Sequence, residues 1–272
     1  MSAIPAWPAT VLIIGCGNMG GAMLAGWLRA GVAPDRFTVV DPALEAAPEG
    51  VELLRSLPEG RVFDLMLLGV KPQMLDNVAG ALTALAGPDT VVLSILAGVE
   101  LASLQMRFPD ARAIIRVMPN LAAAVGKSPM GVVASGLSHE ARDVAMAFLA
   151  PLGAPEWVGE ELFDAVTALA GCGPAFVYRF IQALAAGGEA LGLDGAQSLR
   201  LAQATVDGAA ALAAASPYPP GELARRVASP GGSTQAGLDV LDADSALMKL
   251  VLATMTAARD RNVAMGAEAR KA

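Results

Sequence analysis

The hydrophobic positions in the first half of the chain form short, fully apolar runs that alternate with segments of helical pattern. Such runs are typical of strands buried on both faces of a sheet. They predict strands at Val11–Ile14, Phe37–Val40, 64–70, 91–95 and 113–117, with later strands at 130–134 and around Trp157. The first of these strands is followed by a helical segment at 19–30 and the others by turn residues or a proline. Because short apolar strands alternate with helical segments, we expect an α/β Rossmann domain with a doubly wound parallel sheet.

The pattern changes after Gly159, where strand-like alternation ends. From residue 160 onward the chain is a series of Ala-rich and Leu-rich helical segments, broken at Gly192, 216–220 and 229–232. We therefore predict two domains: an α/β domain at 1–159 and an all-α domain at 160–272. The helical segments 173–191 and 197–215 are apolar over more than one face, more than a small domain can bury. This pattern indicates burial against a second subunit.

Composition and charge narrow the classes of function. Hydrophobic residues make up 54% of the chain and the formal net charge is −7, so a nucleic-acid partner is not expected. A single histidine and two cysteines in separate motifs make a metal site unexpected and favour a reducing, cytoplasmic location. The most apolar stretch, 174–193, is interrupted by Arg179, Gln182 and Glu189, so no membrane span is expected.

The strongest local motif follows the first predicted strand. It is a GxGxxG sequence made of Gly15, Cys16, Gly17, Asn18, Met19 and Gly20. Gly15 permits a tight turn, Gly17 allows close approach of a pyrophosphate, and Gly20 allows close packing of helix on strand. The free N–H groups at the helix start favour phosphate binding. The motif therefore predicts a dinucleotide site.

Asp41 ends the second predicted strand, where an acidic residue binds the ribose 2′-hydroxyl of NAD. No Arg or Lys occurs between Thr38 and Leu54 to attract a 2′-phosphate. This favours NADH, but Asp-Pro is also an ordinary turn opener. The choice between NADPH and NADH stays open at this point.

Three further segments follow later strands, where a doubly wound sheet places its ligand crevice. They are Val70-Lys71-Pro72, Ala97-Gly98 and Met118-Pro119-Asn120. We expect these residues to bind the cofactor near its nicotinamide. A solvated lysine before proline and a turn asparagine are the structural alternatives for Lys71 and Asn120.

The helical half contains a second small-residue loop, with Ser229, Gly231, Gly232, Ser233 and Thr234 as candidate substrate-binding residues. Its backbone N–H groups at a helix start suit a carboxylate, and the Thr234 hydroxyl suits a substrate nitrogen. The structural alternative is an ordinary Ser or Thr helix cap after a Pro-Gly turn.

Taken together, these motifs resemble the pyrroline-5-carboxylate reductase family. The resemblance rests on GCGNMG, VKP, RVMPN, GCGPAF and SPGGST in this order, over roughly residues 11–262. It implies reduction of the cyclic imine 1-pyrroline-5-carboxylate to L-proline by NADPH or NADH, the last step of proline biosynthesis. It also implies a catalytic Thr234 close to the ring nitrogen, and a homodimer that in some members assembles into a decamer. The chain departs from the family pattern at Cys172 and at Leu121-Ala122, which affects expected substrate preference.

Two other classes of protein share parts of this pattern. A β-hydroxyacid dehydrogenase uses a lysine of the second domain as its acid and base, but no lysine occurs between Lys127 and Lys249. An imine that arrives protonated needs no such group. A non-catalytic dinucleotide sensor would have no reason to carry a second anion-binding loop. The imine reductase is therefore our expectation.

Overall fold

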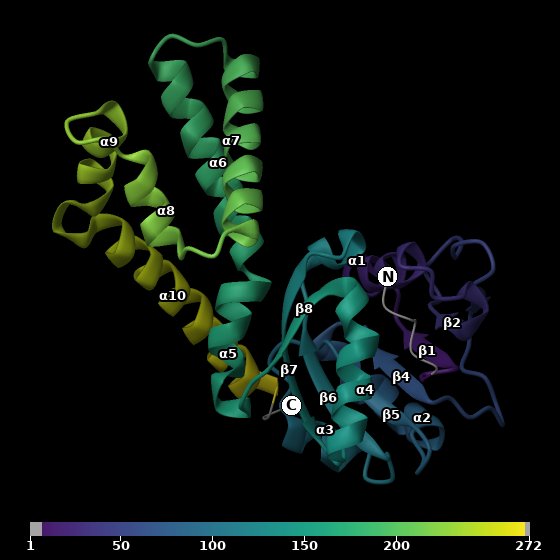
Figure 1. Cartoon of the computed structure of the whole chain (residues 1–272). Coiled ribbons are helices and arrows are strands. Elements are labelled where there is room, and N and C mark those ends of the chain that lie inside the picture. Colours follow the sequence, from purple (N-terminus) through teal and green to yellow (C-terminus); the bar gives the residue numbers. More distant parts are fainter. Residues whose placement is uncertain (1–6, 270–272) are drawn as a thin grey trace. The chain divides into compact units, whose positions relative to one another are not determined.

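The structure is a computed structural model that describes residues 7–269, and its strands form one eight-stranded sheet (Figure 1). The strands are β1 (Val11–Ile14), β2 (Phe37–Val40), β3 (Glu52–Leu54), β4 (Leu65–Leu68), β5 (Val91–Ser94), β6 (Ala113–Met118), β7 (Ser128–Ser135) and β8 (Gly153–Trp157). Their spatial order is β3-β2-β1-β4-β5-β6-β7-β8, and all neighbours are parallel except β6 and β7. The expected Rossmann sheet is confirmed, with one antiparallel pair.

The apolar runs of the sequence form strands because both of their faces are covered. Every residue of β1, β2, β4 and β5 is buried. In β1, Val11 and Ile13 join one hydrophobic cluster while Leu12 and Ile14 join another, as the alternation of side chains along a strand requires. The strand β3 was not predicted, because it has only three residues and begins with the exposed Glu52.

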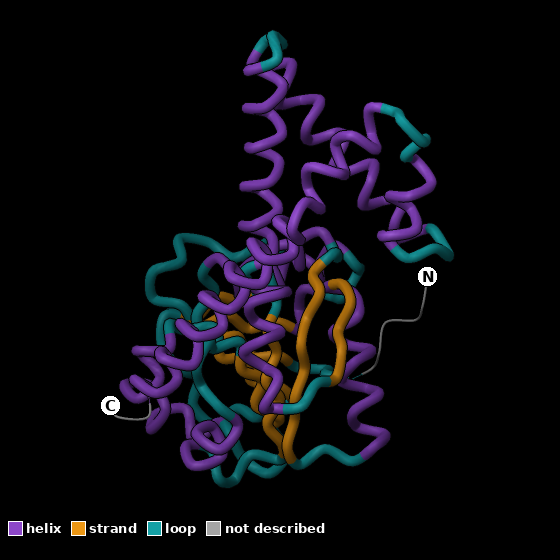
Figure 2. Tube along the Cα trace, turned by 90° about the vertical axis from the view of Figure 1, so that its left-hand side faces the viewer, coloured by secondary structure: helices purple, strands orange, loops and turns teal. Residues whose placement is uncertain are grey.

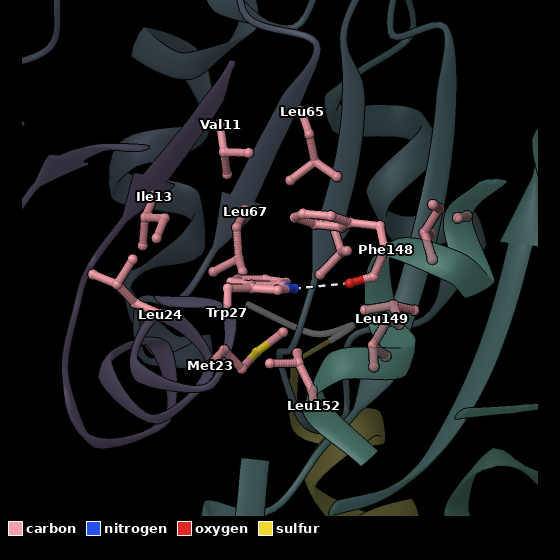
Figure 3. Packing of buried hydrophobic residues seen from close by; sticks show 14 of the residues in the cluster. Val11, Ile13, Met23, Leu24, Trp27, Leu65, Leu67, Phe148, Leu149 and Leu152 are labelled. Atoms are coloured by element: carbon pink, nitrogen blue, oxygen red, sulfur yellow. Dashed lines mark hydrogen bonds between the residues drawn. The ribbon is translucent and has the colours of Figure 1, made fainter. Parts of the chain in front are cut away.

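Trp27, on helix α1 (Asn18–Arg29), lies at the centre of the first cluster (Figure 3). Its ring stacks on Phe37 and Phe148, with centroids 5.7 and 4.6 Å away. The indole N–H donates to the backbone carbonyl of Phe148 over 2.8 Å, which satisfies the polar atom of a buried ring. Phe148 belongs to helix α4 (His139–Leu149), so one side chain joins α1 to α4.

Three shorter helices accompany the sheet: α2 (Leu75–Leu82), α3 (Leu101–Arg107) and α5 (Phe163–Val166), the last continuing into a π-helical turn at Thr167–Gly171. Leu82 and Leu104 place α2 and α3 against the second hydrophobic cluster. Residues 41–51, all within the described part of the chain, form a loop without a helix between β2 and β3. The edge of the sheet is therefore open at that connection.

The remaining helices are α6 (Gly173–Ala190), α7 (Gly195–Ala215), α8 (Pro220–Val227), α9 (Ser233–Asp242) and α10 (Ala246–Ala269). Helices α6 and α7 lie side by side (Figures 1 and 2), and the Ser198 hydroxyl donates to the Ala185 carbonyl over 2.6 Å. Many apolar side chains of these helices are exposed in the single chain, among them Leu212, Leu250 and Leu252. The expected excess of apolar helix surface is present.

The chain forms two compact units. One contains Met1–Cys172 together with Ala258–Ala272, and the other contains Gly173–Ala257. The strands, orange in Figure 2, all belong to the first unit. The helix α10 begins in the second unit and ends in the first. The boundaries of the two compact units thus lie at residues other than 159/160, the domain boundary expected from the sequence.

Candidate active site

The glycine turn between β1 and α1 has the geometry of a dinucleotide cradle. Gly15 adopts a φ of +83°, and its N–H donates to the Val40 carbonyl over 2.9 Å. A Cβ on Gly20 would lie 2.8 Å from the carbonyl oxygen of Gly15, whereas a Cβ on Gly17 would meet nothing within 4 Å. Gly17 also caps α1 without a side-chain hydrogen bond. The turn is therefore closely packed at Gly20 and open at Gly17. A bound pyrophosphate requires such an open approach to the backbone.

Asp41 is tied to this turn by its carboxylate. Its Oδ2 atom accepts the N–H of Cys16 over 2.8 Å, and Oδ1 accepts those of Ala43 and Leu44 over 2.9 and 3.2 Å. The carboxylate thus fixes the end of β2 against the glycine turn. Burial, and secondarily the charge of Asp41, raises the pKa of the Cys16 thiol to about 11. With this raised pKa the Cys16 thiol is neutral at physiological pH.

Arg55, which directly follows β3, reaches the same loop and was missed by the sequence analysis. Its guanidinium donates to the backbone carbonyls of Asp41 over 3.0 Å and Glu45 over 3.2 Å, and also to that of Leu44. Arg55 lies one residue beyond the segment from Thr38 to Leu54, which contains no Arg or Lys. Recognising β3 as a strand would have identified Arg55, because neighbouring parallel strands end at the same edge of the sheet.

The end of β4 lies beside the glycine turn. The N–H of Gly69 donates to the Ile14 carbonyl over 2.8 Å, which brings the start of Val70-Lys71-Pro72 next to the end of β1. Lys71 is exposed. Pro72 and Ala97 line a cavity of about 300 Å³ together with Arg261 and Met265 of α10. The predicted segments are therefore brought to one edge.

Gly98 makes a close backbone contact with the end of α10. It has a φ of +75°, and a Cβ on it would lie 3.1 Å from the Gly266 nitrogen. The glycine is required at this position by both its conformation and its neighbour. Its cofactor contact stays a prediction.

Met118, Pro119 and Asn120 are buried rather than open to a crevice. The Asn120 amide N–H donates to the Ala170 carbonyl over 2.8 Å, and its Oδ1 accepts from Ala122 over 2.9 Å. Asn120 therefore joins the end of β6 to the π-helical turn and caps the turn Leu121–Val125. The side chain of Asn120 is therefore that of a turn asparagine, the alternative given above. A contact of these residues with the cofactor would have to be made by their backbone atoms.

A buried ion pair supports this edge of the sheet. Arg116, 3% exposed, pairs with Glu160 and lies over the ring of Phe163, its guanidinium carbon 4.1 Å from the ring centre. Glu160 also accepts the N–H of Leu101 at the start of α3 over 3.0 Å. Burial lowers the pKa of Arg116, and Glu160 counteracts this shift. The sequence placed Arg116 in a motif but gave it no role, because its partner is far away in the chain.

The second predicted site lies at the start of α9. Gly231 has a φ of +70°, and the N–H of Gly232 donates to the Ser229 carbonyl over 2.9 Å. Gly232 is the helix cap and makes no side-chain capping bond, while Ser233 and Thr234 are exposed in the first turn. The loop therefore presents uncapped N–H groups and two hydroxyls. The ordinary Ser or Thr cap considered as an alternative is not what the structure contains.

Within the described residues no group of three or more His, Cys, Asp or Glu side chains is placed to hold a metal ion. The two loops offer backbone N–H groups, which suit an anion, and the second loop also offers two hydroxyls for hydrogen bonding.

Comparison with known proteins gives two family models. Residues 160–265 match the model described as pyrroline-5-carboxylate reductase dimerisation, and residues 10–98 match the model described as NADP oxidoreductase, coenzyme F420-dependent. A pyrroline-5-carboxylate reductase of Glycine max is 38% identical over 94% of this chain and 96% of its own length.

Solved structures agree with the sequence matches. The pyrroline-5-carboxylate reductase of Coxiella burnetii superposes with a TM-score of 0.87 at 27% identity, covering 94% of this chain and 98% of its own. The pyrroline carboxylate reductase of Plasmodium falciparum, solved with NADP bound, has a TM-score of 0.83 at 25% identity, with coverages of 95% and 98%. Both similarities extend over the two compact units.

One described helical stretch, Glu160–Ala190, has the length and apolar composition to cross a membrane. Only 11% of its most apolar window is buried in the single chain. Length and composition alone do not identify a membrane span, because the core helix of a soluble protein can have the same length and composition. The stretch falls within the segment that matches the dimerisation model.

Proposed function

The chain belongs to the pyrroline-5-carboxylate reductase family, and we propose that it catalyses the reduction of 1-pyrroline-5-carboxylate to L-proline with NADPH or NADH. It is an oxidoreductase that acts on a C=N bond. The observation that carries the proposal is the match to reductases of this family over more than nine-tenths of both chains. The glycine turn and the loop before α9 supply one site for each of the two reactants.

The glycine turn would hold the dinucleotide through the N–H groups at the start of α1, over the open face of Gly17. The residues present fit the group, because side chains are absent where a pyrophosphate would approach. When bound, the reduced nicotinamide supplies the hydride that adds to the carbon of the C=N bond.

The loop before α9 would hold the substrate. The N–H groups of Ser233 and Thr234, with Ser229, Gly231 and Gly232 shaping the turn, are suited to the carboxylate. The Thr234 hydroxyl would hydrogen-bond the ring nitrogen and so set the orientation of the C=N bond. The imine nitrogen brings its own proton, so the absence of a lysine between Lys127 and Lys249 fits this chemistry.

The division of roles follows the two predicted domains. We assign cofactor binding to 1–159, and substrate binding and subunit association to 160–272. The dimerisation match and the exposed apolar side chains of α7 and α10 support a homodimer. We further propose that such dimers can assemble into a decamer. We also propose that the protein is cytoplasmic and has no membrane or nucleic-acid partner.

The experiment is a direct assay of the purified chain. We expect consumption of NADPH or NADH on addition of 1-pyrroline-5-carboxylate, with proline as product, and no reaction of 3-hydroxy acids with the oxidised cofactors. Omitting the imine is the control for background oxidation. Turnover of a hydroxy acid without turnover of the imine would overturn the proposal and favour a β-hydroxyacid dehydrogenase.

A further inference from the structure

The adenosine end of a Rossmann site lies where β2 ends, and here two strands end together. Val40 and Leu54 are paired as the last residues of β2 and β3, so Asp41 and Arg55 leave the sheet side by side. Because residues 41–51 form no helix, the loop between the strands folds around the guanidinium instead. Arg55 is thereby fixed next to the residue expected to contact the ribose.

The charges at this position differ from those that the sequence alone suggests. The Asp41 carboxylate accepts three backbone N–H groups, which offset part of its negative charge. In the described part of the chain Arg55 donates to four backbone carbonyls, which offset part of its positive charge but carry no formal negative charge. Arg55 is also exposed, so a ligand can reach it. Glu45 and Glu49 are the other ionisable residues of the loop.

We propose that Arg55 recognises the 2′-phosphate of NADPH and makes NADPH the preferred cofactor. This inference rests on the proposed function, since it concerns the cofactor of the same site. A guanidinium presents its N–H groups in a planar fork that matches a phosphate, and an Arg near the end of β2 is how Rossmann sites accept the 2′-phosphate. The carbonyl contacts fix the orientation of the fork before the cofactor binds, which reduces the entropy lost on binding.

The test compares cofactor binding by wild type, Arg55→Gln and Arg55→Lys, followed by nicotinamide fluorescence. Gln can keep a carbonyl contact but loses the charge, so we expect the Kd for NADPH to rise about tenfold, which is ~1.4 kcal/mol, with little change for NADH. Lys keeps the charge without the fork and should lie between the two. Adenosine 2′,5′-bisphosphate should compete better than adenosine 5′-monophosphate with wild type, and this advantage should be lost in Arg55→Gln.

Salt dependence separates recognition from a merely structural role. NADPH binding to wild type should weaken with ionic strength more steeply than NADH binding, and Arg55→Gln should abolish the difference. Arg61→Gln is the matched control: Arg61 pairs with Glu52 at the other end of β3, so its loss should leave the NADPH to NADH ratio unchanged.

Each outcome has a distinct meaning. If Arg55→Gln weakens both dinucleotides equally, or neither, Arg55 only holds the loop and the inference is overturned. If the wild-type protein binds neither dinucleotide, the proposed function itself fails. A tighter wild-type Kd for NADH than for NADPH would also contradict the assignment.

Discussion

The Thr234 hydroxyl lies where it can hydrogen-bond a substrate, and it does not cap helix α9. The cap of α9 is Gly232, and Thr234 is exposed one residue into the first turn. Its side chain is therefore expected to affect turnover more than stability. This expectation distinguishes it from Asn120, whose buried amide has two backbone partners and whose loss would destabilise the fold.

We predict that Thr234→Ala lowers kcat/KM about 10- to 100-fold, the loss of one hydrogen bond to a charged partner. The melting temperature and the Kd for NADPH should stay close to those of wild type. Thr234→Ser, which restores the hydroxyl, should recover most of the activity. An Ala variant that melts early but turns over normally would show that the hydroxyl serves the fold instead.

The residue scale is also where the sequence was least informative. The glycine turn could be predicted because its requirements are local: a tight turn, an open approach and a close helix contact. Arg116 could not be given a role, and the two interpretations of Asn120 could not be separated, because Glu160 and the Ala170 carbonyl are distant in sequence. Arg55 was overlooked because its strand is short and half exposed.

At the scale of elements, burial decided which strands could be predicted. β1, β2, β4 and β5 are covered on both faces, so their sequences are continuous apolar runs. β3 lies at the edge of the sheet and has no such constraint. The reversal of β7 against β6 also has no local signature, since strand direction depends on the path of the connection.

Helix α1 offers a test of packing within one element. A Cβ on Gly26 would overlap the Ala123 carbonyl oxygen and lie 2.7 Å from Leu152 Cδ2. We therefore predict that Gly26→Ala destabilises the protein by about 3 kcal/mol or more, through overpacking against backbone. The free energy of unfolding in urea measures this.

Gly21, in the same helix, is the matched control. A Cβ there would lie 3.8 Å from its nearest neighbour, the Cys16 carbonyl oxygen, which is ordinary contact. Gly21→Ala should be neutral or stabilise the protein by roughly 0.5–1 kcal/mol, because alanine favours a helix. Equal losses in both variants would mean that the two sites differ less in packing than the structure indicates.

At the scale of the whole molecule, the exposed apolar side chains of the helical unit predict an obligate dimer. Obligate interfaces resemble a hydrophobic core cut in half. Sedimentation at micromolar concentration should show a dimer or a multiple of it. Replacing Leu250 and Leu252 by Asp should release or unfold the subunits, whereas Val62→Asp, on an equally exposed loop of the sheet unit, should not. A stable, folded wild-type monomer would contradict the prediction.

The residues that make up the two compact units could not be predicted from the sequence, for a related reason. The structure has α10 as one continuous helix, Ala246–Ala269, and nothing in its sequence indicates that its two ends belong to different units. Local patterns define elements, whereas membership of a unit depends on contacts such as that of Gly266 with Gly98.

The return of α10 to the first unit affects how the protein is made. The ribosome synthesises β1 to β8 first, but the segment from Ala258 that packs against the loop of Gly98 follows only after the second unit. The first unit therefore cannot be completed before the helices of the second unit have been synthesised, even though most of its residues are available earlier. A chain released early by a stop codon before Ala258 would lack part of this unit.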